Sequence, residues 1–223
     1  MSLLFIDIET IPSQKPGMLE EFRAVVEPPG TFTKPESIAK WMEENAADKA
    51  QEAYLKTSFD GALGEVVCIG YAFEDEPANV CWRSSLGVSE EVILSEFFYA
   101  VTENAVRTKS HPTYVGHNVL QFDLRFLFQR AVINGVKPPY PLRQDSRYNG
   151  DGTYDTMLAW AGWGNRVKLS KLCDALGIPV KTGGIDGSQV WPYVQAGRFR
   201  EVADYCIEDV EAVREVHRRM TFY

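Results

Sequence analysis

The segment LFIDIET, residues 4–10, combines the pattern of a buried β-strand with two carboxylates. Phe5, Ile6 and Ile8 predict an apolar strand, and Asp7 and Glu9 interrupt it. Alternate residues of a strand point to the same face about 7 Å apart, so these two negative side chains are held side by side. Their mutual repulsion on an apolar element indicates a functional reason for keeping both.

The order of the remaining elements predicts an α/β fold. A short acidic turn joins two strand-like segments, residues 64–73 and 79–85, which indicates an antiparallel hairpin that extends the first strand into a sheet. A further strand at 113–118 is followed by a helix over 122–135 that Gly135 closes. With a last helix over 199–220, we expect a mixed sheet flanked by helices.

Residues 12–63 are predicted to form an insertion after the first strand, within a single domain that spans residues 1–223. Prolines and glycines interrupt its first half. Thr33 and Glu36 have the spacing of a capping box, and a charged amphipathic helix is expected to follow over residues 37–56. We interpret the insertion as a solvated surface excursion, with a lid over a substrate as the alternative.

The formal net charge of −8 argues against a protein that coats nucleic acid through a basic surface, but it permits an enzyme that meets nucleic acid at one local site. The four cysteines lack C-x-x-C spacing and are interpreted as reduced core thiols. No stretch is apolar enough for a membrane-spanning helix or a signal peptide. We therefore expect a cytoplasmic protein without a membrane partner.

Two further segments place acidic residues on apolar helices. Asp123 lies in the first turn of the helix at 122–135, where the helix dipole favours an acid. Tyr205 and Asp209 are four residues apart in the last helix and share one face. Each has a structural explanation by itself, but four carboxylates buried together would each prefer to be neutral unless divalent cations supply the opposite charge. Such oxygen ligands select Mg²⁺ or Mn²⁺, and two ions about 3.5 to 4 Å apart are suited to phosphodiester displacement.

Three motifs in order, FIDIET, GHNVLQFD and YCIEDV, resemble those of the DEDD superfamily of 3'-5' exonucleases, which have an RNase H-like fold. Tyr205 stands four residues before Asp209, and this spacing resembles the tyrosine subclass. The segments YDTMLAW and LCDALGIPVKTGGIDGSQVW are similar to the stand-alone predicted exonucleases related to the proofreading domain of family-B DNA polymerases. The resemblance covers nearly the whole chain and is weakest in the insertion.

The resemblance implies a role for each motif residue. Asp7, Glu9 and Asp209 would hold the metal that binds the attacking water, Asp7 would also bridge to a second metal, and Asp123 would contribute directly or through water. Tyr205 would orient the water. The implied reaction releases nucleoside 5'-monophosphates stepwise from the 3' end of single-stranded or frayed DNA. The candidates for substrate binding are Thr10, Ile11, His117, Asn118, Phe122 and Lys181.

Several alternatives stay open at this point. An RNA 3'-5' exonuclease would carry the same motifs, since readout of the 2'-OH is not visible in them. A non-catalytic nucleic-acid-binding module would have no need to retain mutually repelling carboxylates. A protein partner is possible. The most basic stretch is interpreted as a solvated face, with a rim that grips substrate as the alternative; it contains Arg143, Arg147, Arg166, Lys168 and Lys171.

Overall fold

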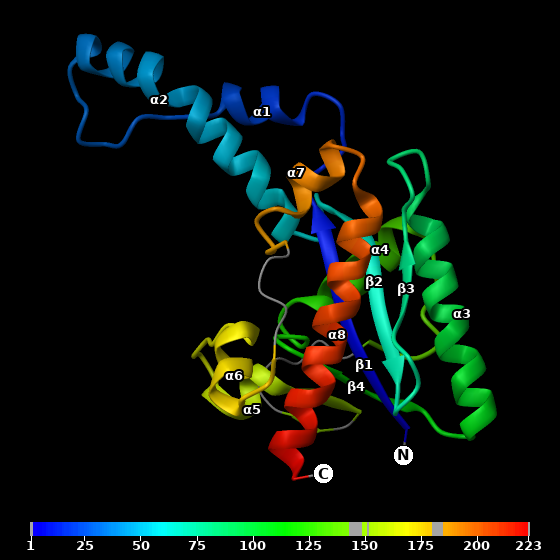
Figure 1. Ribbon diagram of the computed structural model, residues 1–223. Coiled ribbons are helices and arrows are strands. Elements are labelled where there is room, and N and C mark those ends of the chain that lie inside the picture. Colours follow the sequence, from blue (N-terminus) through cyan, green and yellow to red (C-terminus); the bar gives the residue numbers. More distant parts are fainter. Residues whose placement is uncertain (1, 143–148, 151, 180–184, 223) are drawn as a thin grey trace. The chain divides into compact units, whose positions relative to one another are not determined.

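The computed structural model describes residues 2–142, 149–150, 152–179 and 185–222 (Figure 1). The chain divides into two compact units, each described here by itself. Unit 1 consists of Met1–Thr10 and Val66–Tyr223, and unit 2 of Ile11–Glu65. The boundaries of unit 2 lie close to those predicted for the insertion, and the assignment of the whole chain to one domain stays a prediction.

A five-stranded sheet with the order β3-β2-β1-β4-β5 forms the centre of unit 1 among the described residues. The strands are β1 (Ser2–Ile11), β2 (Glu65–Phe73), β3 (Asn79–Trp82), β4 (Pro112–Gly116) and β5 (Thr153–Asp155). β4 runs parallel to both β1 and β5, whereas β2 and β3 are antiparallel. The arrows of β1 and β2 point in opposite directions in Figure 1. The predicted mixed sheet and the 64–85 hairpin are therefore confirmed.

Helices cover both faces of this sheet. They are α3 (Glu90–Thr108), α4 (Asp123–Asn134), α5 (Thr156–Ala161), α6 (Leu169–Leu176), α7 (Val190–Gln195) and α8 (Phe199–Thr221). Leu4, Ile6 and Ile8 of β1 share one buried cluster with residues of α3 and α4. Phe5 belongs to a separate cluster with Val210 and Val213 of α8. Because side chains alternate along a strand, the odd-numbered residues of β1 face α8.

Two close approaches position the elements around β1. A Cβ at Gly70 of β2 would lie 2.9 Å from Cys206 Sγ and 3.0 Å from the Cys206 carbonyl oxygen, so α8 packs directly on the backbone of the sheet. A Cβ at Gly116, the last residue of β4, would lie 2.6 Å from Val119 Cβ. Glycine at both positions lets α8 and the turn that leads into α4 lie close to β1.

A buried ion pair joins α3, α4 and β2. The side chains of Arg130 and Glu90 are 8% and 4% exposed, and Arg130 Nη2 lies 2.6 Å from Glu90 Oε2. Glu90 also accepts hydrogen bonds from the Val66 backbone N–H at 2.7 Å and from Asn134 Nδ2 at 2.8 Å. The carboxylate is thus fully engaged, as a buried charge must be.

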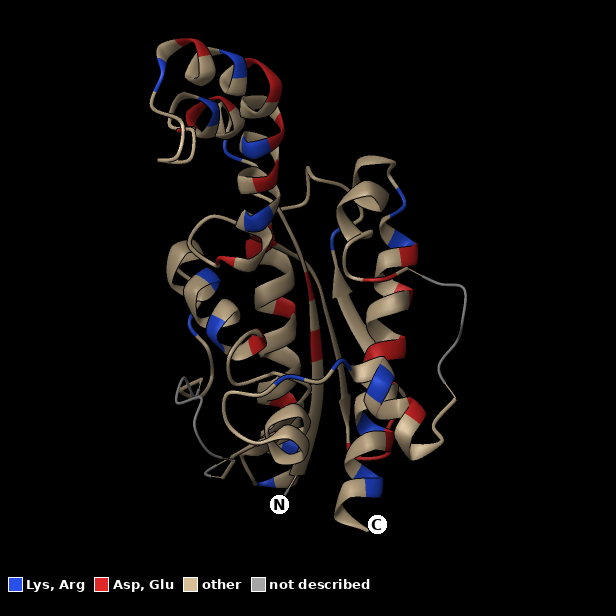
Figure 2. Ribbon diagram, turned by 90° about the vertical axis from the view of Figure 1, so that its left-hand side faces the viewer, with Lys and Arg blue, Asp and Glu red and all other residues tan. Residues whose placement is uncertain are grey.

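Unit 2 consists of α1 (Met18–Ala24), α2 (Pro35–Lys56) and the short 3-10 helix η1 (Thr57–Phe59). In Figure 2, blue and red segments alternate along these helices, so no single sign of charge dominates. Ala50 is the buried residue of α2, and the stripe that includes Trp41 and Met42 is half-buried. The predicted amphipathic helix and its sparse apolar stripe are confirmed.

The helix boundaries correct one local expectation and add two short helices. The N-cap of α2 is Lys34, not Thr33, because Pro35 occupies the first helical position, where its missing N–H costs nothing. Two short helices, α1 and α7, were not predicted. Ser89 is the N-cap of α3, and its side chain makes no capping hydrogen bond. Within the described ranges no helix is long and apolar enough to cross a membrane.

Candidate active site

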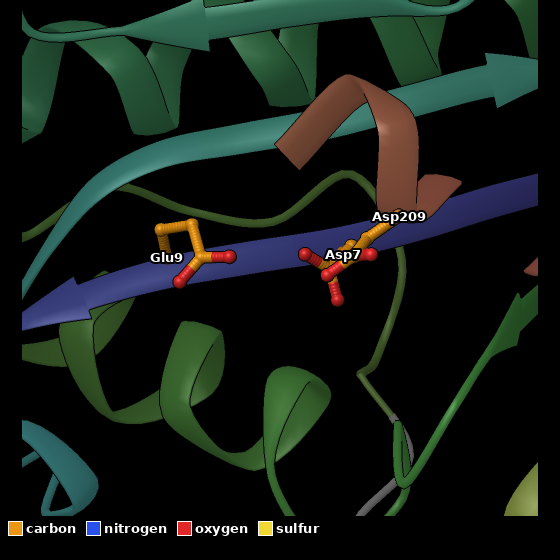
Figure 3. Close-up of side chains that lie close together, drawn as sticks. All are labelled: Asp7, Glu9 and Asp209. Carbon is orange, nitrogen blue, oxygen red and sulfur yellow. The ribbon is translucent and has the colours of Figure 1, made fainter. Parts of the chain in front are cut away.

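Three carboxylates converge on the face of β1 that α8 covers. Asp7 and Glu9 leave β1 on the same side, and Asp209 reaches them from α8 (Figure 3). One ligand oxygen from each lies within 4.8 Å of the others. Glu9 is buried, while Asp7 and Asp209 are half-buried. The predicted pairing of the first and third carboxylate segments is therefore seen in space.

Asp123 approaches the same strand from α4. Its Oδ1 accepts a hydrogen bond of 3.1 Å from the backbone N–H of Ile8, the residue between Asp7 and Glu9. The pairing of β1 with β4 runs from Ser2 to Phe5, so Ile8 lies beyond the paired part of the strand. The Asp123 carboxylate therefore binds the β1 backbone where β4 no longer does, and this places it beside the other three acids.

Burial and mutual repulsion disfavour ionisation throughout this group. Burial is the main cause that raises the pKa of Asp7 and of Glu9 well above the ordinary values, and the neighbouring carboxylates raise both further. Burial also raises the pKa of Asp123 to about 7 and that of Asp209 to about 6. In the described part of the chain none of the four is in an ion pair with Lys or Arg. Positive charge from outside the chain would be needed to keep all four ionised.

Tyr205 borders the cluster as a neutral hydrogen-bond donor. Its hydroxyl donates to Asp209, one helical turn further along α8, and this hydrogen bond lowers the pKa of Asp209. Burial first, and then the charges of Asp209 and Glu9, raise the pKa of Tyr205 far above its ordinary value of 10.0. A phenolate is thus excluded at neutral pH, and Tyr205 orients a partner instead of accepting a proton.

The comparison with family profiles agrees with this arrangement. Residues 54–222 match the family described as predicted 3'-5' exonucleases related to the exonuclease domain of PolB. The chain belongs to this family. The match includes Asp123, Tyr205 and Asp209, whereas β1 with Asp7 and Glu9 precedes the matched residues.

Among solved structures, the chain is similar to the family B DNA polymerase from the hyperthermophilic archaeon Pyrobaculum calidifontis. The TM-score is 0.59 at 18% sequence identity, and the match covers 99% of this chain and 24% of the polymerase. At this identity the likeness shows the fold. The search of curated proteins gives no match.

The donor set suits the divalent cations expected of an exonuclease of this kind. It contains only carboxylate oxygens, which are the ligands preferred by Mg²⁺ and Mn²⁺. Burial, and after it the neighbouring carboxylates, raises the pKa of Asp7 and of Glu9, and the positive charge of bound cations would oppose both effects. Asp7, Glu9 and Asp209 are the residues placed to hold a cation, and Asp123 is adjacent.

Binding of Mn²⁺ is expected to weaken as the pH falls from about 8 to about 6, because protons then compete for carboxylates with raised pKa values. Each proton displaced on binding contributes up to about tenfold in dissociation constant per pH unit. Calorimetric titration of the protein with Mn²⁺ across this range measures the slope. A dissociation constant that does not change with pH would contradict the assignment of these acids as ligands.

The substitution Tyr205→Phe removes the hydroxyl that donates to Asp209 and leaves the ring packing in place. We expect turnover to fall roughly ten- to hundredfold, as is typical for a group that orients a metal ligand, with little change in thermal stability. Steady-state hydrolysis and the melting temperature are the two measurements. Unchanged turnover would remove Tyr205 from the mechanism.

Asp155 organises the turn that carries the second motif. Its carboxylate accepts the backbone N–H groups of Asn118 at 3.0 Å and Leu120 at 3.2 Å, and it also caps α5. Asn118 needs this support, since its φ of 66° is rare for a residue other than glycine. These bonds give Asp155 a local structural role, because they hold the turn immediately before Asp123.

Both ring nitrogens of His117 are engaged. Nδ1 lies 2.9 Å from Thr156 Oγ1, and Nε2 lies 2.8 Å from the carbonyl oxygen of Val167. The ring therefore ties the β4–α4 turn to the loop between α5 and α6. This favours the structural interpretation of His117 over a phosphate contact.

The remaining substrate candidates stay predictions. Thr10 is half-buried and Ile11 is fully buried at the end of β1. The ring of Phe122 is half-buried, and its centroid lies 5.6 Å from that of Phe126, as expected for a residue that packs on the core. Lys181 lies outside the described residues, as do Arg143 and Arg147.

Cys206 is a neighbour of the site that the sequence interpretation missed. Its Sγ lies 3.4 Å from the Asp7 carbonyl oxygen and 3.6 Å from Asp7 Oδ2. Burial raises the pKa of this thiol, so it stays protonated. The signal was available, because Cys206 precedes Asp209 by three residues and therefore lies on nearly the same face of α8.

Proposed function

We propose that this protein is a metal-dependent 3'-5' exonuclease that hydrolyses phosphodiester bonds at the 3' end of single-stranded or frayed DNA and releases nucleoside 5'-monophosphates. The observation that carries this proposal is the convergence of Asp7, Glu9 and Asp209, with Asp123 bound to the backbone between the first two. The family match supports the reaction class.

In this proposal the four carboxylates bind the metal ions and orient them. Two divalent cations, Mg²⁺ or Mn²⁺, supply when bound the positive charge that stabilises the transition state and makes hydroxide available at neutral pH. Asp7 lies between Glu9 and Asp209 and is the residue suited to serve both cations. Asp123 fixes the conformation of β1 at this point through its bond to Ile8 and closes the other side of the site.

Tyr205 positions Asp209 and the attacking water by donating its hydroxyl proton in a hydrogen bond. It keeps that proton throughout, because its pKa lies far above neutral pH. Asp7 and its partners remain ionised while the cations are bound. The cytoplasmic location predicted from the sequence belongs to this proposal, as does the absence of a membrane partner.

A time course on a 5'-labelled single-stranded DNA oligonucleotide tests the function. Parallel reactions contain Mg²⁺, Mn²⁺ or EDTA, and a matched RNA oligonucleotide reports the sugar preference. We expect a ladder that shortens from the 3' end, disappears with EDTA and is absent with the Asp209→Asn protein. The matched control is Asp204→Asn, which removes an acid of the same helix whose partner is Arg200.

Two outcomes would contradict the proposal. One is immediate release of the labelled 5' nucleotide, which indicates the opposite polarity. The other is cleavage that Asp209→Asn does not diminish, which indicates a different site. Metal-dependent shortening of RNA but not DNA would keep the reaction and change its substrate.

A further inference from the structure

A cavity beside the second motif is lined by residues suited to single-stranded nucleic acid. Its volume is about 370 Å³, and it lies between the start of α4 and the loop that joins α5 to α6. The lining residues are Gln121, Arg125, Trp163, Gly164, Asn165 and Arg166. Among the residues that the structure describes, the lining has two arginines, two side-chain amides and one tryptophan, and none of these described residues is acidic.

This composition differs from that of the whole chain. Acidic residues outnumber basic ones by 31 to 23 in the whole chain, whereas the described lining residues of this cavity include two arginines and no acid. Arginine matches the geometry of phosphate oxygens and also stacks on planar groups. The cavity is thus a local positive site on a negative protein, which a phosphate backbone would select.

Trp163 supplies a face for stacking. It is 54% exposed, although burial of a tryptophan side chain would contribute favourably to folding. An aromatic face next to basic groups is the usual arrangement for holding an unpaired base, because every base has a π-face. The amides of Gln121 and Asn165 can hydrogen-bond to base edges or sugar hydroxyls.

The cavity is linked to the second motif through its lining residues on α4 and through the loop that carries Arg166. Gln121 and Arg125 lie two residues before and after Asp123, and the Val167 carbonyl, next to Arg166, is bonded to His117. Because Arg125 follows Asp123 by two residues, its side chain leaves α4 on a different side from the carboxylate. The cavity therefore lies beside the part of the chain that carries Asp123, on a different side of α4 from the carboxylate.

We infer that this cavity binds the single strand on the 5' side of the scissile phosphate, with Arg125 and Arg166 on backbone phosphates and Trp163 stacked on a base. The inference rests on the proposed exonuclease function. It assigns Arg166, a residue of the most basic stretch, to substrate binding. Of the two interpretations of that stretch, this one is the rim that grips substrate. It also gives a role to the hydrogen bond between His117 Nε2 and the Val167 carbonyl oxygen, which holds the loop that carries Arg166.

Binding without turnover tests this inference separately from catalysis. The probe is a fluorescein-labelled oligothymidylate of about 15 nucleotides, with oligouridylate as a second arm, and the Asp209→Asn protein prevents cleavage. We expect Trp163→Ala to weaken binding about five- to hundredfold in fluorescence anisotropy, which corresponds to the loss of one stacked base. Arg166→Ala should lower the slope of log affinity against log salt by about 0.7, as expected for one lost phosphate contact.

Arg107→Ala is the matched control, since it removes an exposed arginine of α3 that pairs with Glu76 at a distance from this cavity. It should leave affinity and salt slope close to those of the parent. Parent-like binding of both Trp163→Ala and Arg166→Ala would overturn the inference even if the enzyme proves to be a nuclease. Weakened binding combined with no hydrolysis by the wild-type protein would refute the proposed function and leave the strand-binding cavity supported.

Discussion

Replacement of Asp7 by Asn is expected to reduce phosphodiester hydrolysis by about a thousandfold or more, because the transition-state stabilisation supplied by bound cations is worth several kcal/mol. A carboxylate oxygen of Asp7 lies within 4.8 Å of one from its strand neighbour Glu9 and of one from the helix residue Asp209. Asn keeps the size of the side chain and removes its charge. Initial rates on single-stranded DNA at saturating Mg²⁺ measure the effect.

The same variant should be more stable than the wild-type protein when metal is absent. The folded-state pKa of Asp7 is raised above its ordinary value of 3.8, so the wild-type protein loses stability as pH rises from that value through the folded-state pKa. Asn at this position does not titrate. The melting temperature of Asp7→Asn should therefore exceed that of the wild type at about pH 8, and the difference should shrink toward about pH 4.

A matched control distinguishes this effect from a general effect of removing acids. Asp204→Asn changes a residue that pairs with Arg200 on the surface of α8 and should show no pH-dependent gain. A fully active Asp7→Asn protein would refute the metal assignment. A variant that is less stable than the wild type in EDTA at high pH would refute the electrostatic account of the cluster.

The carboxylate cluster was predictable from the sequence because strand and helix periodicities fix which side chains share a face. Asp7 and Glu9 are held together by the strand repeat, and Tyr205 and Asp209 by the helical repeat. That these two pairs lie together in space was inferred from the order of the motifs. The close packing of α8 on Gly70 brings them together physically. Asp123 was assigned to the same site by the family resemblance. Its hydrogen bond to the backbone N–H of Ile8 explains in geometric terms why it lies beside Asp7 and Glu9.

Contacts between residues that are far apart in the sequence could not be predicted. Glu90 begins a helix, and an acid at that position has a sufficient explanation in the helix dipole, so nothing local indicated a partner 40 residues away. The structural role of His117 depends on its hydrogen bond to the carbonyl oxygen of Val167, which is 50 residues away in the sequence. The start of α2 was misassigned for a local reason, because proline at the first helical position outweighed the capping-box spacing.

The second large effect is expected from Arg130→Met, which should lower the free energy of unfolding by about 3–5 kcal/mol. The substitution keeps much of the side-chain volume but leaves the Glu90 carboxylate buried without its counter-charge. The hydrogen bonds from Val66 and Asn134 cannot offset a desolvated charge. Urea unfolding at neutral pH measures the loss.

The double variant Glu90→Gln, Arg130→Met decides whether the loss comes from the unpaired charge or from lost packing. The introduced glutamine amide would keep an acceptor for the Val66 N–H while removing the charge, so a charge penalty predicts that the double variant recovers a large part of the stability. Arg107→Met is the surface control. It breaks the exposed pair with Glu76 and should cost no more than about 1 kcal/mol. Equal losses in the single and double variants would show that the guanidinium stabilises the α3–α4 contact through packing and its other bonds, because no charge would then remain uncompensated.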